Sequence, residues 1–517
     1  MRLSHRQRLM EEQDKRGGWR ASSTPLAIFA TLFALIAMWA FATPLMASPD
    51  ETAHAIKAAA VVRGQPLGDQ GEGQGAQSSV LVPGYIAQLP EKTCFRFQPT
   101  ITADCANGVG EASAEPTIAT TSAGNYNPMY YYVAGLPTLL MDGDAVVYAM
   151  RLLSAALCAT FLTLTFWAAA RLASARWVVV SGVVALTPMV LFLSASINPN
   201  ALEIVTTAAL FTNLAAGIER RERPGAPYGM HLLAAAVSGA VLANTRALSL
   251  VWLVAAILGV VLIYRRRAVM TILRTPAGLV CSAILLSASA ASLAWLFYAD
   301  SLDSLTGNGS AVTPEQAFLT MIERAFSLTR EYIGVLGWMD TVLPDGVYFF
   351  WHFCLAAVLF AGVALTKGWA RVGMLGLLAS IVLLPALLQA QVITELGYIW
   401  QGRYVLALVV LALLYGGVAV EKTPFPSGKR SAAVASWVLT VLVLTHVYAF
   451  IFTLRRYTVG LDGTVNWTEM FSAEWQPVLS WQLLTLLYAA VLAYAASRLR
   501  RYLVHEPRVG SRSVPMA

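Results

Sequence analysis

The residues best suited to chemistry follow directly after the first long apolar run: the adjacent acids Asp50 and Glu51, with His54 one helical turn after Asp50. A carboxylate held at a membrane surface can remove a proton from a sugar hydroxyl as that hydroxyl attacks a phosphate-activated sugar. His54 would align this acid or add a second titratable group. The structural alternatives are that Pro49-Asp50 starts a helix, that the acids are solvated, and that the histidine is a polar filler.

A second group of candidates consists of arginines beside apolar segments, Arg246 and Arg403, the latter flanked by Gln401 and Tyr404. A charge at mid-bilayer costs around 2.5 to 3.5 kcal/mol on insertion scales, so such a residue usually pairs, lines a cavity or serves a function. A guanidinium offers forked donors to a phosphate oxygen. We therefore hypothesise that these four residues bind a lipid phosphate. The alternative for Arg403 is snorkelling from a helix end.

Polar and aromatic residues at the edges of apolar runs supply candidates for a substrate cavity. One set lies in Asn125-Tyr126-Asn127-Pro128-Met129-Tyr130-Tyr131-Tyr132, which is also typical of an aromatic belt at the water–lipid boundary. The other lies in Ser196-Ile197-Asn198-Pro199-Asn200, with Glu203 one helical turn further on. The cavity candidates are Tyr126, Asn127, Tyr130, Asn198 and Asn200.

The composition shows which kind of protein must position these residues. The chain has 517 residues, of which 57% are hydrophobic and 13% charged, and its mean hydropathy is +0.60. One soluble core could not bury so much apolar surface, so we expect an all-α integral membrane protein. A bilayer core of about 30 Å needs roughly 20 apolar residues per helix. About twelve such segments are expected, at 25–46, 145–170, 177–196, 200–218, 230–246, 248–264, 276–298, 347–366, 371–391, 403–420, 431–453 and 479–497.

The pair of segments around Asn244-Thr245-Arg246 is the least certain, because each member is short and could be a broken or half-buried helix.

The distribution of basic residues predicts the orientation of the bundle. The net charge is +7, but Lys and Arg cluster in short connections, as orientation determinants do, which argues against a nucleic-acid partner.

With the basic groups on the cytoplasmic side, both termini are cytoplasmic. The long polar stretches 47–144, 299–346 and 454–478 are then extracytoplasmic. The expected organisation is a cytoplasmic tail (1–24), a transmembrane domain (25–497) and a basic cytoplasmic tail (498–517). The first apolar segment is too long for a cleaved signal and is interpreted as a retained anchor.

Cysteine usage fits an oxidising exterior. Cys158, Cys281 and Cys354 lie in apolar segments and are expected to be packing residues. Cys94 and Cys105 flank ten residues of the first outer loop, where a disulfide is permitted but not required. This pair alone has too few ligands for a metal site. A glycine-rich stretch at 68–75 is expected to be a mobile loop.

Several motifs together resemble a known family. They are Pro49-Asp50-Glu51 with His54 and Arg63-Gly64, Asn127-Pro128-Met129-Tyr130-Tyr131, Leu186-Thr187-Pro188-Met189 with Ser196 to Asn200, and Gln401-Gly402-Arg403-Tyr404. In this order, over roughly residues 25 to 420, they look like a bacterial family of predicted membrane proteins with a domain of unknown function. That family is similar to the GT-C glycosyltransferases.

The resemblance implies a plasma-membrane enzyme that takes a sugar from a polyprenyl-phosphate carrier on the outer face. It would pass the sugar, with inversion, to a cell-envelope glycan or glycolipid in polysaccharide biosynthesis. Asp50 matches the acid of the first outer loop, Glu51 is a neighbour that could share or replace it, and Arg403 matches a phosphate position. Where such proteins often have an acid after Asn-Pro, this chain has Asn200, which weakens the case for a second acidic site.

Other points stay open from the sequence. No metal site is predicted, although some GT-C enzymes use a divalent cation. A flippase for lipid-linked sugars and a polymerase or ligase of lipid-linked glycans are the alternative functions. The sequence does not name the sugar or the acceptor, and it does not say whether Asp50 or Glu51 is the base. In the 299–346 loop, Trp338, Asp340 and Asp345 could form an acceptor wall, but the acids are more simply explained as solvated.

Overall fold

The computed structural model describes residues 24–504 except 71–76, 107, 109–113, 223–224, 226, 302–308, 421–425, 427 and 464. The predicted tails, at 1–23 and after 504, and most of the glycine-rich stretch lie outside the described residues. Within these limits the chain is a bundle of long apolar helices, which confirms the predicted all-α multi-pass membrane protein. Ten described helices are long and apolar enough to cross a membrane, or eleven if one bent pair is counted as a single span.

The long helices are α2 (Thr24–Ala42), α6 (Gly143–Ala169), α9 (Pro199–Arg221), α11 (Ser249–Leu273), α12 (Pro276–Tyr298), α15 (Asp345–Ala364), α16 (Gly368–Leu396), α17 (Leu406–Ala419, preceded by the 3₁₀ turn η4, Gly402–Val405), α18 (Lys429–Thr458) and α19 (Trp481–Val504). The bent pair is α7 (Ala175–Ala185) and α8 (Pro188–Ser194), which meet at 71°. The apolar helix α10 (Gly229–Ala243) is too short to pass the same test. All twelve predicted segments are therefore helical, but two of them are not simple spans.

Proline and a capping residue start several of these helices. Asn198 caps α9 by accepting from the backbone N–H of Asn200 at 2.9 Å, and Pro199 occupies the first turn. Thr187-Pro188 starts α8 and Thr275-Pro276 starts α12 in the same way. A proline in the first turn needs no hydrogen-bond partner for its missing N–H, and the cap satisfies a neighbouring donor. The breaks between segments are thus encoded locally.

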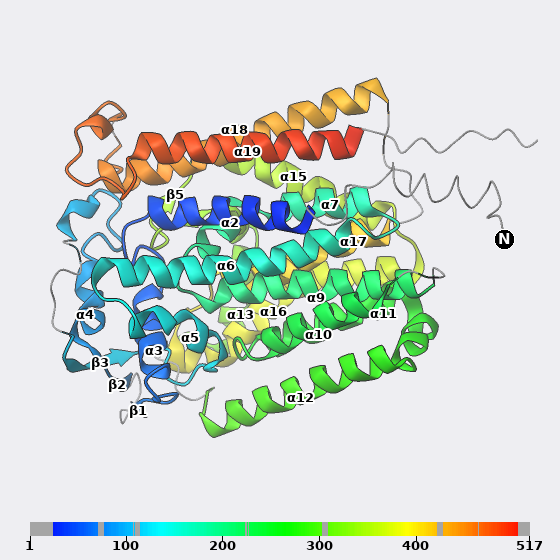
Figure 1. Cartoon of the computed structure of the whole chain (residues 1–517), viewed down its shortest axis with the longest axis horizontal. Helices are drawn as coiled ribbons and strands as arrows, with labels where there is room; N and C mark the ends of the chain where they lie inside the picture. Colours follow the sequence, from blue (N-terminus) through cyan, green and yellow to red (C-terminus); the bar gives the residue numbers. More distant parts are fainter. Residues whose placement is uncertain are drawn as a thin grey trace, which may run out of the picture.

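The polar stretches fold into a lobe at one end of the bundle (Figure 1). The first stretch contains α3 (Glu51–Val61), α4 (Gly84–Ala87), α5 (Met129–Ala134) and the 3₁₀ turns η1 (Leu89–Lys92), η2 (Ala103–Cys105) and η3 (Leu136–Leu139). Its antiparallel sheet has the order β1 (Asp69–Gln70), β2 (Ser78–Pro83), β3 (Pro116–Thr121), with Ser79 opposite Thr120. The second stretch contributes α13 (Pro314–Arg324), α14 (Thr329–Ile333), β4 (Val335–Leu336) and β5 (Thr341–Val342), and the third contributes η5 (Glu469–Phe471).

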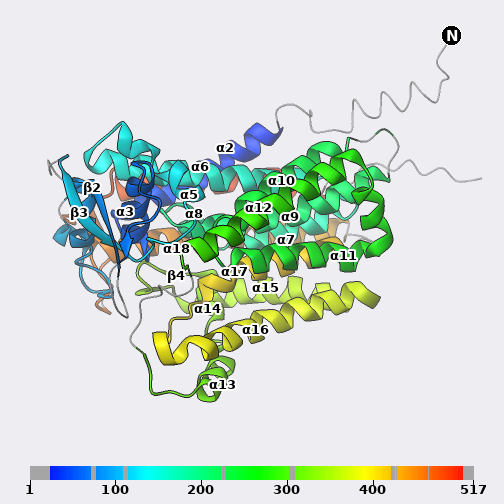
Figure 2. The same cartoon turned by 90° about the horizontal axis from the view of Figure 1, so that it is seen from below.

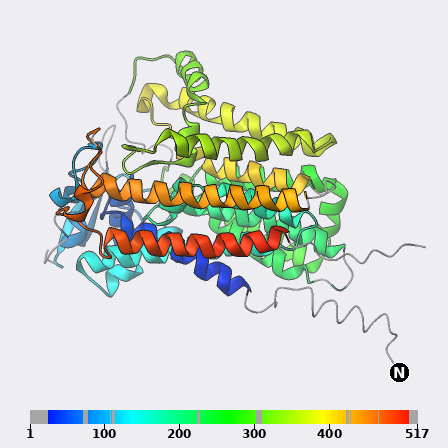
Figure 3. The same cartoon turned by 90° about the horizontal axis from the view of Figure 1, so that it is seen from above.

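Helices α9 and α17 lie at the centre of the bundle, with 94% and 89% of their apolar windows buried. Helix α12 lies at the edge and packs mainly against α10. Helices α18 and α19 (orange and red) run side by side over another flank (Figure 3). The short connections between α6 and α7 and between α11 and α12 lie at the end opposite the sheet (Figure 1).

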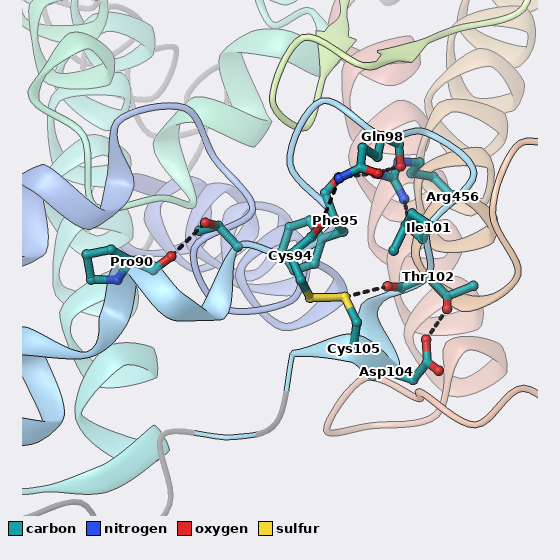
Figure 4. The surroundings of a disulfide bond; sticks show 10 residues. Pro90, Cys94, Phe95, Gln98, Ile101, Thr102, Asp104, Cys105 and Arg456 are labelled. Atoms are coloured by element: carbon teal, nitrogen blue, oxygen red, sulfur yellow. Dashed lines mark hydrogen bonds between the residues drawn. A yellow bond between two sulfur atoms is a disulfide. The ribbon is translucent and has the colours of Figure 1, made fainter.

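Cys94 and Cys105 form a disulfide across Cα atoms 6.2 Å apart, which decides the question that the sequence left open. The other three cysteines are free and buried. Arg456, at the end of α18, enters the closed loop and donates to the carbonyl oxygens of Phe95, at 2.8 Å, and Gln98, at 2.9 Å (Figure 4). The disulfide loop is therefore fastened to the transmembrane bundle by a buried cation.

Removing the disulfide, as Cys94→Ser with Cys105→Ser, should destabilise the lobe that contains it, because closing a loop of this length corresponds to roughly 3 kcal/mol of chain entropy. We expect faster hydrogen–deuterium exchange in residues 94–105 than in the wild type, with unchanged exchange in α9. Cys281→Ser, at a buried free cysteine, is the control. Equal exchange of the loop in both variants would contradict a stabilising disulfide.

The loop at 299–346 holds its polar residues differently from the sequence-based prediction. Only 5% of the Asp340 side chain is exposed, and its carboxylate pairs with Arg456 at 3.0 Å, so the expectation that it is solvated is wrong. Trp338 donates to the backbone carbonyl of Met46 at 2.9 Å and is buried. Asp345 is solvated as expected, with 87% of its side chain exposed. Asp340 and Trp338 thus tie the loops together.

Candidate functional site

The site begins where the chain turns from α2 into α3. Asp50 precedes α3 in a left-handed conformation, with φ of 64°, and its side chain makes no capping hydrogen bond. Aspartate tolerates this conformation better than most residues, and a positive φ outside glycine is often found at functional sites. Asp50 therefore directs its carboxylate away from the helix that it starts, and 45% of the side chain is exposed.

The partner of Asp50 is Arg403, which is separated from it by 353 residues in the chain. The Nη2 of Arg403 donates to Oδ2 of Asp50 at 2.5 Å. The same guanidinium donates through Nε to Oε1 of Gln401 at 2.6 Å, and its Nη1 donates to the carbonyl of Pro49 at 3.4 Å. The Arg403 side chain is only 4% exposed. All three nitrogen atoms of the Arg403 guanidinium are therefore hydrogen-bonded within the protein, one of them to Asp50.

A second arginine lies beside this pair. Arg246, between α10 and α11, pairs with Glu203 at 3.1 Å. Its guanidinium carbon lies 5.2 Å from the ring centre of Tyr404 and 5.7 Å from that of Tyr126, which are cation–π distances. Its side chain is 17% exposed, compared with 4% for Arg403. The side chain of Arg246 is therefore the more exposed of the two.

Directly after Asn198-Pro199 the chain has Asn200 and no acid, but Glu203 lies one helical turn further along α9. Its Oε1 accepts from Ser249 at 2.7 Å, and its Oε2 accepts from Asn200 at 3.1 Å as well as from Arg246. The side chain of Asn200 is thus hydrogen-bonded to this acid. Its own Oδ1 is buried without a hydrogen-bond partner. An acid is therefore present beside Asn200, although Asn200 itself is not one.

Glu51 has a different environment from that of its neighbour Asp50. It is fully buried and accepts from Arg151 twice, Nε to Oε1 at 2.7 Å and Nη2 to Oε2 at 2.6 Å. The backbone N–H of Ile197 also donates to Oε1, at 3.1 Å. Arg151 itself donates to the backbone carbonyls of residues 40, 43 and 44. These contacts leave Glu51 no access to a substrate, and they argue for a structural rather than a catalytic role.

His54 is buried among aromatic rings rather than paired with Asp50. Its Nδ1 lies 2.8 Å from the hydroxyl of Tyr131, and its ring centre is 5.9 Å from those of Tyr131 and Tyr126. Burial lowers the pKa of His54 to about 3, although the nearby Asp50 acts in the opposite direction. His54 is thus neutral near pH 7 and is suited to positioning rather than to proton exchange.

The neutral state of His54 predicts how stability depends on pH. Since the unfolded state has a histidine pKa near 6.5 and the folded state one of about 3, the unfolded state binds the extra proton between these values. Stability should therefore be complete above pH 6.5 and fall as the pH drops towards 3. We expect the unfolding temperature of His54→Gln to depend less steeply on pH than that of the wild type in this window. Parallel pH curves would contradict a buried neutral histidine.

The electrostatics of Asp50 combine opposing effects. Burial alone would raise its pKa, but the positive charges of Arg403 and Arg246 outweigh burial and hold the pKa below its usual value. Asp50 is consequently ionised at neutral pH, able to accept a hydrogen bond but a weak base as long as Arg403 remains paired with it.

The remaining predicted residues surround the cluster to different degrees. Tyr126 and Tyr404 flank Arg246, and Asn198 donates to the carbonyl of Pro49 at 3.2 Å. Asn127 instead donates to Oδ1 of Asn244, at 3.1 Å, and the hydroxyl of Tyr130 lies 3.0 Å from that of Ser154. The structure therefore brings most of the predicted residues to one place, with Tyr130 directed into the packing between α5 and α6.

Sequence analysis missed Glu331, a further acid of this site. It lies in α14, and its Oε2 accepts from the backbone N–H of Gly402 at 2.5 Å. Burial raises its pKa, against the lowering effects of that hydrogen bond and of Arg403. Together with Pro49, Gln401 and Arg403 it lines a small cavity otherwise formed by apolar side chains. No local motif marks Glu331, because its role depends on the packing of α14 against η4. Among the described residues, no group of three or more His, Cys, Asp or Glu side chains is arranged to hold a metal ion.

Comparisons with curated proteins and with solved structures leave the reaction open. No curated protein matches this chain. Among solved structures, the chain is similar to one described as the crystal structure of ArnT from Cupriavidus metallidurans bound to undecaprenyl phosphate. The identity is 10% and the TM-score 0.45, and the match covers 93% of this chain and 77% of that chain.

The family match covers most of the transmembrane helices and includes the residues of the two ion pairs, Asp50–Arg403 and Glu203–Arg246. The family described as Predicted membrane protein (DUF2142) matches residues 33–412, a range that includes Asp50, Glu203, Arg246 and Arg403. Since this match extends over well more than half of the 517 residues, the chain belongs to the DUF2142 family of predicted membrane proteins.

Proposed function

We propose that this protein is a membrane glycosyltransferase that moves a sugar from a polyprenyl-phosphate carrier to an acceptor on the outer face, with inversion. The observation that carries the proposal is the Asp50–Arg403 pair with Arg246 beside it, at the end of a membrane bundle. An ionised acid and two guanidinium groups suit a reaction in which a hydroxyl loses a proton and a phosphate leaves as an anion.

In this mechanism Asp50 accepts the proton of the acceptor hydroxyl. The hydroxyl oxygen forms a bond to the anomeric carbon from the face opposite the carrier, and the bond between that carbon and the phosphate oxygen breaks. The electron pair of the broken bond leaves with the polyprenyl phosphate, whose charge a guanidinium stabilises. Glu51 takes no part, because Arg151 and backbone groups occupy its oxygens.

In this proposal Arg246 keeps the phosphate-binding role predicted from the sequence, whereas Arg403 has the additional role of holding Asp50. Arg246 is the first contact for the phosphate, because its side chain is more exposed than that of Arg403. Arg403 positions Asp50 until the phosphate competes for its guanidinium. A phosphate that draws Arg403 away removes the main influence that lowers the pKa of Asp50, so donor binding makes the acid a better base.

The test is sugar transfer from a panel of radiolabelled polyprenyl-phosphate sugars to membrane acceptors by the purified protein in nanodiscs. Transfer with at least one donor, with release of polyprenyl phosphate, would support the proposal. Transbilayer movement of the same lipids without transfer would overturn it in favour of the flippase. Transfer that requires a donor carrying an oligosaccharide would favour the polymerase or ligase.

A further inference from the structure

A pocket of about 550 Å³ lies at the end of α3 that is remote from Asp50. Helix α3 has eleven residues, so its two ends are about 15 Å apart at 1.5 Å per residue. In two perpendicular views α3 crosses the ends of the long helices rather than running along them (Figures 1 and 2). The pocket and the Asp50 cluster therefore lie at the same end of the bundle, joined by one short helix. Its volume is within the range typical of small-molecule sites.

One wall of the pocket is apolar and exposed. Leu139, Leu140 and Met141 line it and are 51%, 85% and 45% exposed. They are followed at once by α6, a membrane-spanning helix that begins at Gly143. Residues directly before such a helix lie at the boundary between water and lipid. An exposed apolar rim at this level is suited to contact hydrocarbon chains.

The interior of the pocket is polar and nearly balanced in charge. Arg63 donates to Oγ1 of Thr138 at 2.7 Å and to its carbonyl at 2.6 Å, and the hydroxyl of Tyr85 donates to the carbonyl of Met141 at 3.1 Å. Asp142 is the N-cap residue of α6, but its exposed carboxylate makes no capping hydrogen bond. One cation and one anion with a tyrosine between them suit hydroxyl groups, which both donate and accept, better than a second phosphate.

The pocket is held at a fixed distance from Asp50. Gly135 precedes η3, and a Cβ at this position would collide with the carbonyl oxygen of Ala58 and the side chain of Val62 in and after α3. Arg63, one residue past the end of this helix region, is bonded to Thr138 of η3. The rim segment is consequently packed directly on α3, so its position relative to the catalytic acid is set by close packing.

We propose that this pocket binds the sugar head of a membrane-anchored acceptor, a glycolipid whose hydrocarbon chains contact the rim formed by Leu139, Leu140 and Met141. The inference rests on the proposed function and names the class of acceptor. A soluble glycan would not require an apolar rim next to α6, and a purely lipid-binding anchor would not require Arg63 and Asp142 behind it.

A label on the rim tests this proposal without any donor. Leu140→Cys is suitable because the described cysteines are either in a disulfide or buried. The bimane-labelled protein would be placed in phosphatidylcholine nanodiscs, alone or with digalactosyl diacylglycerol. The comparison arms contain free digalactoside or phosphatidylglycerol. We expect a saturable change in fluorescence with digalactosyl diacylglycerol and none in either comparison arm.

Two substitutions check that the signal arises from the pocket. Asp142→Asn and Tyr85→Phe should each weaken the apparent affinity for the glycolipid by roughly tenfold, the loss expected when one or two hydrogen bonds are removed. Glu469→Gln, at an exposed acid in the turn η5, should leave the affinity unchanged. Loss of binding in both pocket variants, with intact donor transfer chemistry at Asp50, would support the proposal.

Several results would overturn it. An equal response to free digalactoside would show a site for soluble glycans, and an equal response to phosphatidylglycerol would show non-selective lipid contact. No response to any probe would show that the pocket does not bind the acceptor. Because the assay contains no polyprenyl donor, these failures differ from failure of the proposed function, which is read out as absence of sugar transfer.

Discussion

Asp50→Asn is expected to abolish sugar transfer while leaving the binding of polyprenyl phosphate intact or tighter. The amide cannot accept the proton of the acceptor, and loss of general-base catalysis typically costs 10²- to 10⁴-fold in rate. The same substitution removes the carboxylate that holds Arg403 at 2.5 Å. The freed guanidinium should then bind phosphate more strongly, by on the order of tenfold, or about 1.4 kcal/mol.

The two effects have opposite signs, which makes the experiment informative. Transfer is measured with radiolabelled donor and binding with undecaprenyl phosphate by native mass spectrometry of the same preparations. Arg246→Gln should show the reverse pattern in binding, with weaker affinity, because it removes the more exposed guanidinium. Asp345→Asn is the matched acid control. If Asp50→Asn weakened phosphate binding, the proposal that Arg403 leaves Asp50 to bind the phosphate would be wrong.

Glu51→Gln is expected to act on folding rather than on chemistry, despite its position next to Asp50. Glu51 and Arg151 are 0% and 1% exposed, and their double hydrogen bond has no route to solvent. Removing one partner of such a pair leaves an uncompensated buried charge, which costs about 3 to 5 kcal/mol. We expect a large fall in unfolding temperature and in the yield of folded protein for Glu51→Gln and for Arg151→Met.

The exposed pair Arg330–Asp345 provides the control, since exposed ion pairs contribute only about 0 to 1 kcal/mol. The double variant Glu51→Gln with Arg151→Met should recover part of the lost stability, because neither charge is then left alone. A stable Glu51→Gln protein that has lost transfer activity would instead identify Glu51 as a base. It would contradict the conclusion that Glu51 contributes to folding and not to catalysis.

Some features of the fold were predictable because they depend on local sequence. Every one of the twelve apolar segments is helical, and breaks at Thr187-Pro188 and Asn198-Pro199 follow from capping and proline. The uncertain pair around Arg246 is resolved by the packing of α10, which is short but buried against α9 and α12. Length and hydropathy specify that a segment is helical, but the neighbouring helices decide whether it spans, bends or stops short.

The candidate site could be predicted only as a collection of residues. Sequence analysis singled out Asp50, Arg246 and Arg403 from charge and context, and the structure brings them together across 353 residues of chain. The pairing of Arg403 with Asp50 and of Arg246 with Glu203 was not predicted, because an ion pair between distant segments leaves no periodic signal. Glu331 was missed for the same reason.

The sequence by itself determined that this is a helical multi-pass membrane protein with polar loops and an acid pair after its first span. The tertiary structure alone decided which acid is accessible. Asp50 and Glu51 are adjacent, so their side chains leave the backbone in different directions. The packing of α6 places Arg151 against Glu51, while η4 places Arg403 beside Asp50. One acid is thereby buried in a closed ion pair and the other stays half exposed, an outcome fixed by contacts about 100 and 353 residues away in the chain.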